Sequence, residues 1–242
     1  MKKALLFPML LVVCPAIAQT SFHIGPLAGA TLYSVHYGDN PPFTRPATTY
    51  HPGFEAGILG TLQFGHLAFQ PAILFAQKGY TSRYEIVPSP GTLPPSSYAN
   101  TTRLNYLTLL LNLAYTQRPD GQGFQAFAGP YVSYLVGGHY HSDYNFYTLG
   151  STGELEGQVV AGDHNPATAG SNDSYSKRWD VGLQAGLGYR YQQLLLQVGY
   201  SVGLRNLAAT IPGFPPGTIV TTTPIYNRGF QASIAYLFGP KS

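Results

Sequence analysis

A strict alternation of side-chain type most constrains the fold of this chain. Between Trp179 and Arg190 the sequence reads WDVGLQAGLGYR, in which apolar residues alternate with small or polar ones. Successive side chains of a β-strand point to opposite faces, so each alternate set covers one face. The stretch therefore predicts a strand with one apolar face and one small, polar face.

Eight segments of the chain alternate in this way, and no helical periodicity of useful length is present. They are roughly Phe22–His36, Gly53–Phe64, Leu67–Arg83, Arg103–Tyr115, Phe124–Tyr140, Trp179–Arg190, Gln193–Arg205 and Tyr226–Phe238. Short connections (Gly65-His66, Thr116–Gly123, Tyr191-Gln192) alternate with long ones (Tyr37–Pro52, Tyr84–Thr102, His141–Arg178, Asn206–Ile225). Short periplasmic turns and long extracellular loops are typical of transmembrane β-barrels. The pattern predicts an all-β fold, an eight-stranded antiparallel up-and-down transmembrane β-barrel.

The first residues have the form of a secretory signal peptide. Lys2 and Lys3 precede a short apolar run, and Ala16-Ile17-Ala18 follows it. This predicts a cleaved signal peptide at 1–18 and a barrel domain at 19–242; the run is too short for a membrane anchor. A lipoprotein site at Cys14, the only cysteine, is disfavoured because a small residue does not precede it. The mature chain then has no disulfide and no thiolate metal site.

The composition favours a membrane environment. Only 10% of residues are charged, where soluble domains average about 25%. Without the two leader lysines, 11 basic residues face 10 acidic ones, and this balance gives no indication of a nucleic-acid partner. A soluble ligand-binding barrel, as in lipocalins, is the alternative, but its outer surface should be rich in Lys and Glu. We therefore expect the apolar set to face outer-membrane lipid and the small set to fill a narrow lumen.

Aromatic residues are expected to form two girdles at the membrane interfaces. The periplasmic girdle would contain Tyr115, Phe124, Tyr189, Tyr191, Tyr236 and Phe238, and the extracellular one Trp179, Phe54, Tyr226 and Phe230.

Four charged residues fall on the inward set near the extracellular end: Glu55, Lys78, Asp180 and Arg205. Counting back from the two shortest turns sets Glu55 opposite Ala76 and Asp180 opposite Gly203. The nearest opposite charges then lie on the diagonals, within reach of long side chains. This predicts two structural ion pairs, Glu55–Lys78 and Asp180–Arg205, that close the mouth of the lumen; the alternative is solvated rim charges of little energetic value.

Several stretches carry a resemblance to a known family. They are AGATLYS, GFEAGILGTLQF, LAFQPAILFAQKGY, LNYLTLLLNLAY, FAGPYVSYLVGG, DVGLQAGLGYRY and ASIAYLFG. With them the chain resembles the PorT-like outer-membrane β-barrel family of Bacteroidota, which is similar in architecture to the OmpA transmembrane domain. Leu110 stands where that family usually has a proline. The resemblance implies a barrel in the outer membrane of a Gram-negative bacterium, without a known activity.

The stretch HYHSDYN, His139 to Asn145, is the nearest candidate for chemistry. Some eight-stranded barrels modify lipid A with a His-x-Ser pair on one face, but here His141 and Ser142 are adjacent and point to opposite faces. His139 and His141 share a face, yet two histidines without a third ligand are a weak metal signal. Asp143 and His164 lie in the same predicted loop with nothing to fix their positions. We predict no catalytic, cofactor-binding or metal site.

The longest predicted loop, 141–178, is the most plausible recognition surface, although it could also be an unspecialised loop. Its charged residues are Asp143, Glu154, Glu156, Asp163, Asp173, Lys177 and Arg178. The predicted function is a non-enzymatic integral outer-membrane protein with a side-chain-filled lumen. It would act through this loop on an envelope protein or an extracellular ligand, or as an envelope component. A lipid-modifying enzyme and a small-molecule carrier or narrow channel are the alternatives.

Overall fold

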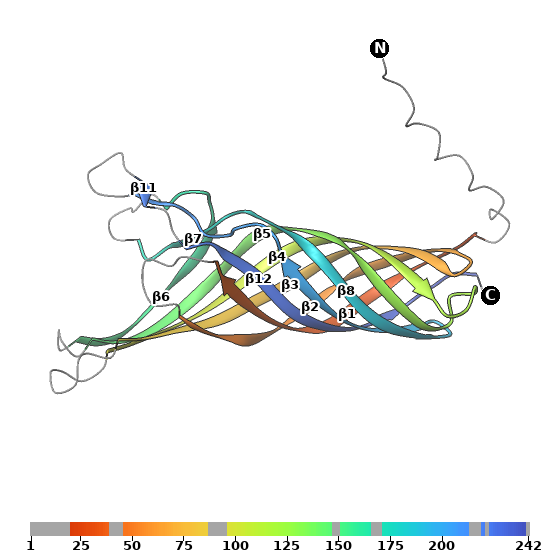
Figure 1. The fold of residues 1–242 in the computed structure, drawn as a ribbon, viewed down its shortest axis with the longest axis horizontal. Helices are drawn as coiled ribbons and strands as arrows, with labels where there is room; N and C mark the ends of the chain where they lie inside the picture. The colour runs from red at the N-terminus through yellow and green to blue at the C-terminus, as the bar shows by residue number, and fades with distance from the viewer. Residues whose placement is uncertain are drawn as a thin grey trace, which may run out of the picture.

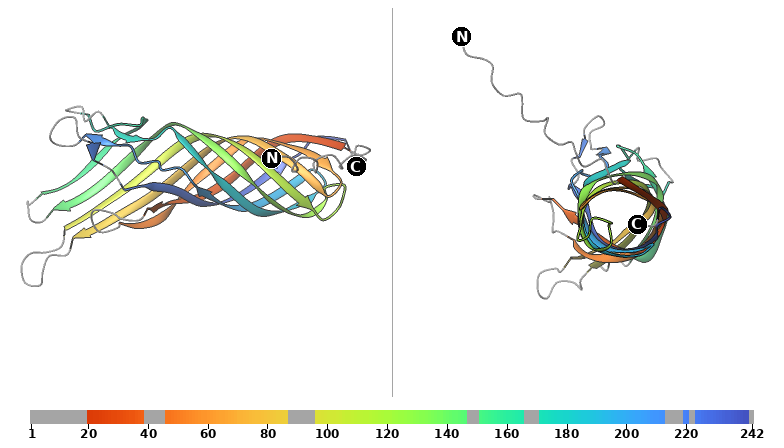
Figure 2. Two further views of the ribbon diagram at one scale, coloured as in Figure 1. Left: turned by 45° about the horizontal axis from the view of Figure 1, so that its top comes forward. Right: turned by 90° about the vertical axis from the view of Figure 1, so that its right-hand side faces the viewer.

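The computed structural model describes residues 20–38, 46–86, 96–146, 151–165, 171–212, 219–220 and 223–240, so the predicted signal peptide lies outside the described residues. Eight long strands close into a tilted antiparallel barrel, which is seen end-on in Figure 2. They are β1 (Thr20–Tyr37), β2 (Ala47–Phe64), β3 (Leu67–Ile86), β4 (Ser96–Thr116), β5 (Gly123–Phe146), β8 (Trp179–Tyr191), β9 (Leu194–Gly203) and β12 (Ile225–Tyr236). Each pairs with the next in this order, and β12 pairs with β1. The predicted fold class and strand number are confirmed.

Within these ranges the chain contains no helix that is long and apolar enough to span a membrane.

Four further strands of the described chain lie outside the ring. β6 (Ser151–Ala161) pairs antiparallel with the last part of β5, from Gly138 to Phe146, which we call its upper part. β7 (Ser174–Ser176) pairs parallel with β6. β10 (Ile211–Pro212) pairs with β11 (Ile219–Val220). At the end opposite to the short turns, β5 and β6 extend well beyond the barrel (Figure 1).

The prediction of a loop at 141–178 was therefore partly wrong. β5 continues to Phe146 and returns as β6, and the paired strands β3 and β4 likewise extend into the predicted connection Tyr84–Thr102. Alternation marks a strand only where its two faces meet different environments. Beyond the membrane the outward residues are no longer apolar, as Glu154 and Gln158 show, so the apolar-outward pattern ends while the backbone ladder continues.

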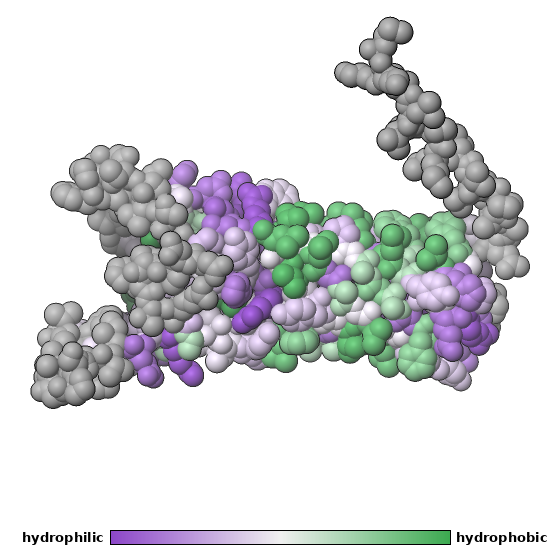
Figure 3. Space-filling view, in the orientation of Figure 1, coloured by the Kyte–Doolittle hydropathy of each residue, from purple (hydrophilic) through white to green (hydrophobic). Residues whose placement is uncertain are grey.

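The burial of alternate residues shows which set faces outward. Leu183 and Val198 are 53% and 57% exposed, whereas Gln184, between two outward neighbours, is 6% exposed. On the face drawn in Figure 3, apolar residues cover the middle of the barrel and hydrophilic residues lie toward its ends. A soluble barrel would place the apolar set inside, so the lipocalin-like alternative does not fit.

Aromatic rings gather on the outside at both ends of this apolar zone. At the periplasmic end all six predicted girdle residues are exposed, and Phe124 packs against Tyr189 with ring centroids 4.9 Å apart. At the other end Trp179 packs against Tyr134 at the same distance. Phe54 and Phe230 are also exposed there, whereas Tyr226, the fourth residue predicted for this girdle, is half-buried. The strands thus present the two interfacial girdles of a membrane-spanning barrel.

Candidate functional site

An ion pair crosses the lumen near its extracellular end. Lys78 Nζ on β3 lies 2.8 Å from Asp180 Oδ2 on β8, and the two side chains are 2% and 0% exposed. The ammonium also donates to Ser133 Oγ at 3.2 Å. The carboxylate accepts hydrogen bonds from Asn227 Nδ2 at 2.9 Å and from Tyr131 OH at 3.3 Å. Both charges are therefore paired and hydrogen-bonded, as burial requires.

Three tyrosine rings surround the same ammonium. Lys78 Nζ lies 5.2, 5.0 and 4.5 Å from the ring centroids of Tyr33, Tyr106 and Tyr131, distances at which a cation is attracted by a ring. All three rings are buried. We call the ion pair and these rings the lumen plug.

The structure pairs the four predicted lumen charges differently from the prediction. Glu55 does lie opposite Ala76, as predicted, but Lys78 reaches across the lumen to Asp180. Glu55 is buried beside a small cavity of about 10 Å³ that Lys78 also lines. Arg205 is exposed and follows the end of β9.

The position of the β8–β9 turn explains the second difference. Tyr191 pairs with Leu194, so the turn is Gln192-Gln193, one residue later than predicted. The register therefore shifts by two residues, which sets Gly203 opposite Gly182 instead of Asp180. β9 ends at that point, and Arg205 does not enter the lumen.

Layers of amide side chains fill the lumen below the plug. In the first layer, Gln184 Nε2 donates to Asn112 Oδ1 at 2.9 Å and Gln231 Nε2 donates to Gln184 Oε1 at 2.9 Å. In the second, Gln70 donates to Gln125 at 3.0 Å and accepts from Gln197 at 3.2 Å. An eight-stranded barrel is just wide enough for side chains to fill it. These side chains leave no space for a wide pore, and they pair with one another except at a few buried atoms such as Gln125 Nε2 and Gln231 Oε1.

A second cavity, of about 170 Å³, lies at the extracellular mouth. Tyr80, Leu104 and Asn227 line its barrel side, and Ser176 and Leu207 belong to the connections that lean over it. These connections are tied together by the hydrogen bond from Lys177 N to Leu207 O at 2.9 Å. The mouth is thus partly covered from outside.

An irregularity in β5 determines which side chains face outward above the membrane. β5 pairs Leu135 with Tyr106 and Gly137 with Asn105, so Val136 is an extra residue, a β-bulge. Below the bulge the even-numbered residues of β5 face outward, and above it the odd-numbered ones do. His139, His141 and Asp143 consequently face outward.

The two residues considered for hydrolase chemistry diverge, as expected from their adjacency. Ser142 is fully buried, and its Oγ lies 3.0 Å from the hydroxyl of Tyr98. His141 instead faces outward, with its Nε2 3.3 Å from Asp143 Oδ1. No nucleophile–base pair forms between them.

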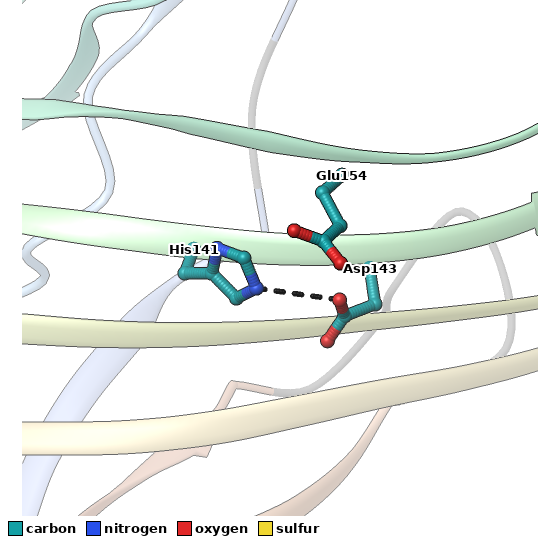
Figure 4. A group of neighbouring side chains, drawn as sticks. All are labelled: His141, Asp143 and Glu154. Atoms are coloured by element: carbon teal, nitrogen blue, oxygen red, sulfur yellow. Dashed lines mark ion pairs between the residues drawn. The ribbon is translucent and has the colours of Figure 1, made fainter.

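The structure brings a third potential ligand to His141 and Asp143. Glu154 on β6 lies directly opposite Asp143, and one ligand atom of each of the three residues lies within 4.8 Å of the other two (Figure 4). His164 is not part of this group; its Nδ1 bonds to Thr210 Oγ1. The sequence alone did not single out Glu154 because β6 was read as loop. The spacing Glu154-x-Glu156, which puts both residues on one face of a strand, was the available signal.

Arg178 and Asp163, which also belong to the predicted recognition loop, contact neighbouring segments at the end of the barrel. The guanidinium of Arg178 lies 5.9 Å from the ring centroid of Tyr134 and donates to Ala161 O at 3.5 Å. Asp163 accepts a backbone hydrogen bond from Thr210 at 3.0 Å. These contacts tie the segment after β6 to the barrel rim.

One family model matches most of this chain, whereas the similar solved structures are distant. No curated protein matches the chain. Among solved structures, Ail of Yersinia pestis, crystallised with the heparin analogue sucrose octasulfate, is 9% identical over 90% of this chain and 99% of its own, with a TM-score of 0.38. The monoaromatic hydrocarbon channel TodX is 8% identical over 94% of this chain and 92% of its own, with a TM-score of 0.22. The family model for the outer membrane protein beta-barrel domain matches residues 17–209. The chain is a multi-pass barrel of the outer membrane and belongs to the outer membrane protein beta-barrel domain family.

Proposed function

We propose that this protein is a non-conducting, non-enzymatic component of the outer membrane that acts through its extracellular side. The lumen plug is the observation that carries the proposal. Lys78 and Asp180 form an ion pair across the lumen, and both side chains are almost completely buried. Because the two amide layers lie directly below, a solute would have to break both layers as well as the plug to cross.

The exposed groups on the upper part of β5 support a binding role more than a catalytic one. Hydrolase chemistry needs a nucleophile and a base within hydrogen-bond reach. Ser142 and His141 point to opposite faces of β5, so they do not meet this requirement. Loops and strand ends on a rigid scaffold commonly carry recognition instead.

The binding surface proposed here is the region 141–178, which now includes the paired upper parts of β5 and β6. Its partner would be an extracellular ligand or another envelope protein, with outer-membrane lipid around the barrel. We place the protein within the PorT-like group, with a signal peptide at 1–18, on the strength of the stretches quoted above and of Lys2, Lys3 and the Ala16-Ile17-Ala18 site.

Planar-bilayer recording of the purified protein tests the closed lumen. We expect no steady conductance from the wild type. The variant Lys78→Ala/Asp180→Ala removes both charged ends of the plug and should admit small, ion-selective currents if the amide layers part. Gln192→Asn, in the periplasmic turn, is the matched control and should stay silent. A stable, porin-sized conductance of the wild type would overturn the proposal.

A further inference from the structure

The residues of β5 that face outward form a row, which changes from apolar to polar at the β-bulge. From Phe124 to Val136 this row is apolar or aromatic, and above it the row continues with His139, His141 and Asp143. With a rise of about 3.4 Å per residue and a tilt of about 40°, the apolar part spans roughly 30 Å along the membrane normal, close to the height of the lipid-facing band. His141 and Asp143 therefore lie in water, beyond the extracellular girdle.

The bulge itself aims these side chains. If the same sequence continued without a bulge, so that even-numbered residues of β5 still faced outward beyond Val136, His141 and Asp143 would point into the lumen and Ser142 outward. Bulges occur preferentially where a strand must re-aim a side chain near a functional site. The same device brings both residues onto the face that Glu154 shares from β6.

The charges of this face are not balanced by protein cations. Asp143 and Glu154 are direct cross-strand partners, an arrangement that is unfavourable for two like charges. Among the described residues, neither carboxylate forms an ion pair with Lys or Arg; the recorded ion pair of the group is between His141 and Asp143. A bound cation would relieve the repulsion.

We propose that His141, Asp143 and Glu154 bind a divalent transition-metal ion, with zinc as the best-matched ion. Donors on one tetrahedral zinc lie roughly 3.4 Å apart, given metal–ligand distances of about 2.0–2.2 Å. The His141–Asp143 separation of 3.3 Å already matches this value. The remaining pairs lie within 4.8 Å and need a movement of little more than about 1 Å, which the exposed Glu154 side chain can make.

The donor set defines the class of ion. One imidazole nitrogen and two carboxylate oxygens suit zinc, nickel or copper, whereas calcium and magnesium prefer oxygen ligands only. Three protein ligands leave at least one position for water or for a donor from another molecule. The site would thus give the proposed extracellular surface a metal-dependent mode of binding, and in this respect it rests on the proposed function.

Isothermal titration of the folded protein in detergent with zinc chloride tests the site, using protein without a histidine tag. The wild type should bind one zinc ion per chain. His141→Ala, Asp143→Asn and Glu154→Gln should each weaken zinc binding about tenfold or more. Even residues that only hydrogen-bond to a metal ligand typically contribute about 10–100-fold to metal affinity, and these three would bind the ion directly. His139→Ala and Glu156→Gln are matched controls on the same two strands and the same face, and should bind zinc like the wild type.

The proposal would be overturned by the absence of zinc binding, by equal zinc affinity of His141→Ala and the wild type, or by calcium binding as tight as zinc binding. A loss of affinity in His139→Ala but not in Glu154→Gln would assign the ion to the histidine pair and also overturn it. Bilayer recordings of the same preparations separate the two proposals. Zinc binding by a conducting protein would reject the closed lumen alone, and a silent protein without zinc binding would reject the metal site alone.

Discussion

Replacing Lys78 by Met should destabilise the barrel strongly. The substitution keeps most of the side-chain volume but leaves Asp180 fully buried without a counter-ion, with Tyr131 and Asn227 as its remaining recorded side-chain donors. Removing one partner of a buried ion pair typically costs about 3–5 kcal/mol. The free energy of unfolding, measured by urea titration in lipid vesicles, should fall by that amount.

The reciprocal substitution, Asp180→Asn, should be milder. The ammonium of Lys78 then keeps Ser133 and the three tyrosine rings at 4.5–5.2 Å. A cation–ring contact contributes about 0.5–1 kcal/mol or more when it is shielded from water, so we expect Asp180→Asn to cost about 1–2 kcal/mol less than Lys78→Met. The double variant Lys78→Met/Asp180→Asn should lose less free energy of unfolding than the two single variants lose together, because it leaves neither charge unpaired.

If the free-energy cost of the double variant equals the sum of the two single costs, the two charges do not interact and the reasoning is refuted. If Lys78→Met costs less than about 1 kcal/mol, the pair behaves like a solvated surface pair and the lumen is wet at this level. Leu74→Ala, in the same strand and also buried, serves as a control for general loss of packing, because it should cost about 2–5 kcal/mol without coupling to Asp180.

Three further predictions address the faces, the lumen and the bulge. Leu183→Arg or Val198→Arg, on the lipid face, should each lower the free energy of unfolding in vesicles by about 2–4 kcal/mol, and the same substitutions at the aqueous end of the barrel should cost little. Gln70→Leu should cost about 2–4 kcal/mol in the same assay, because it leaves one buried amide group unpaired on each of Gln125 and Gln197. Deletion of Val136 should remove the bulge without turning the strand beyond it, because Gly137 then takes the outward place of Val136 and His141 and Asp143 keep facing outward. Zinc binding in calorimetry and heat-modifiable migration on gels should both persist, and a loss of zinc binding would contradict this account of the faces.

The membrane-spanning part of the fold could be predicted from the sequence because lipid imposes the alternation. Each strand there needs an apolar outer face and, in a narrow barrel, a small or amide inner face. Leu183 and Gln184 are adjacent examples, and the structure places them as predicted. Above the membrane this contrast disappears, so β6 was read as a loop.

The partners of the lumen charges were harder to predict, for two physical reasons. The stretch Tyr191-Gln192-Gln193 allows more than one two-residue turn, and Gln192 adopts a positive φ of 55°, which is uncommon for a residue other than glycine. In addition, Lys78 and Asp180 belong to strands that are not neighbours. Counting register identifies cross-strand partners, but it gives no distance across the lumen.

The length of β5 has a consequence for how a bound ligand could be used. At about 3.4 Å per residue and a tilt of about 40°, its 24 residues extend roughly 60 Å along the membrane normal, about twice the height of the lipid-facing band. β5 and β6 therefore hold their outward side chains on a stiff, hydrogen-bonded arm that stands clear of the bilayer surface. Since side chains fill the lumen below, a ligand bound at the end of this arm has no open channel to open or close. The geometry suits tethering, in which a ligand is kept at a fixed height above the cell, rather than transport or signalling through the barrel.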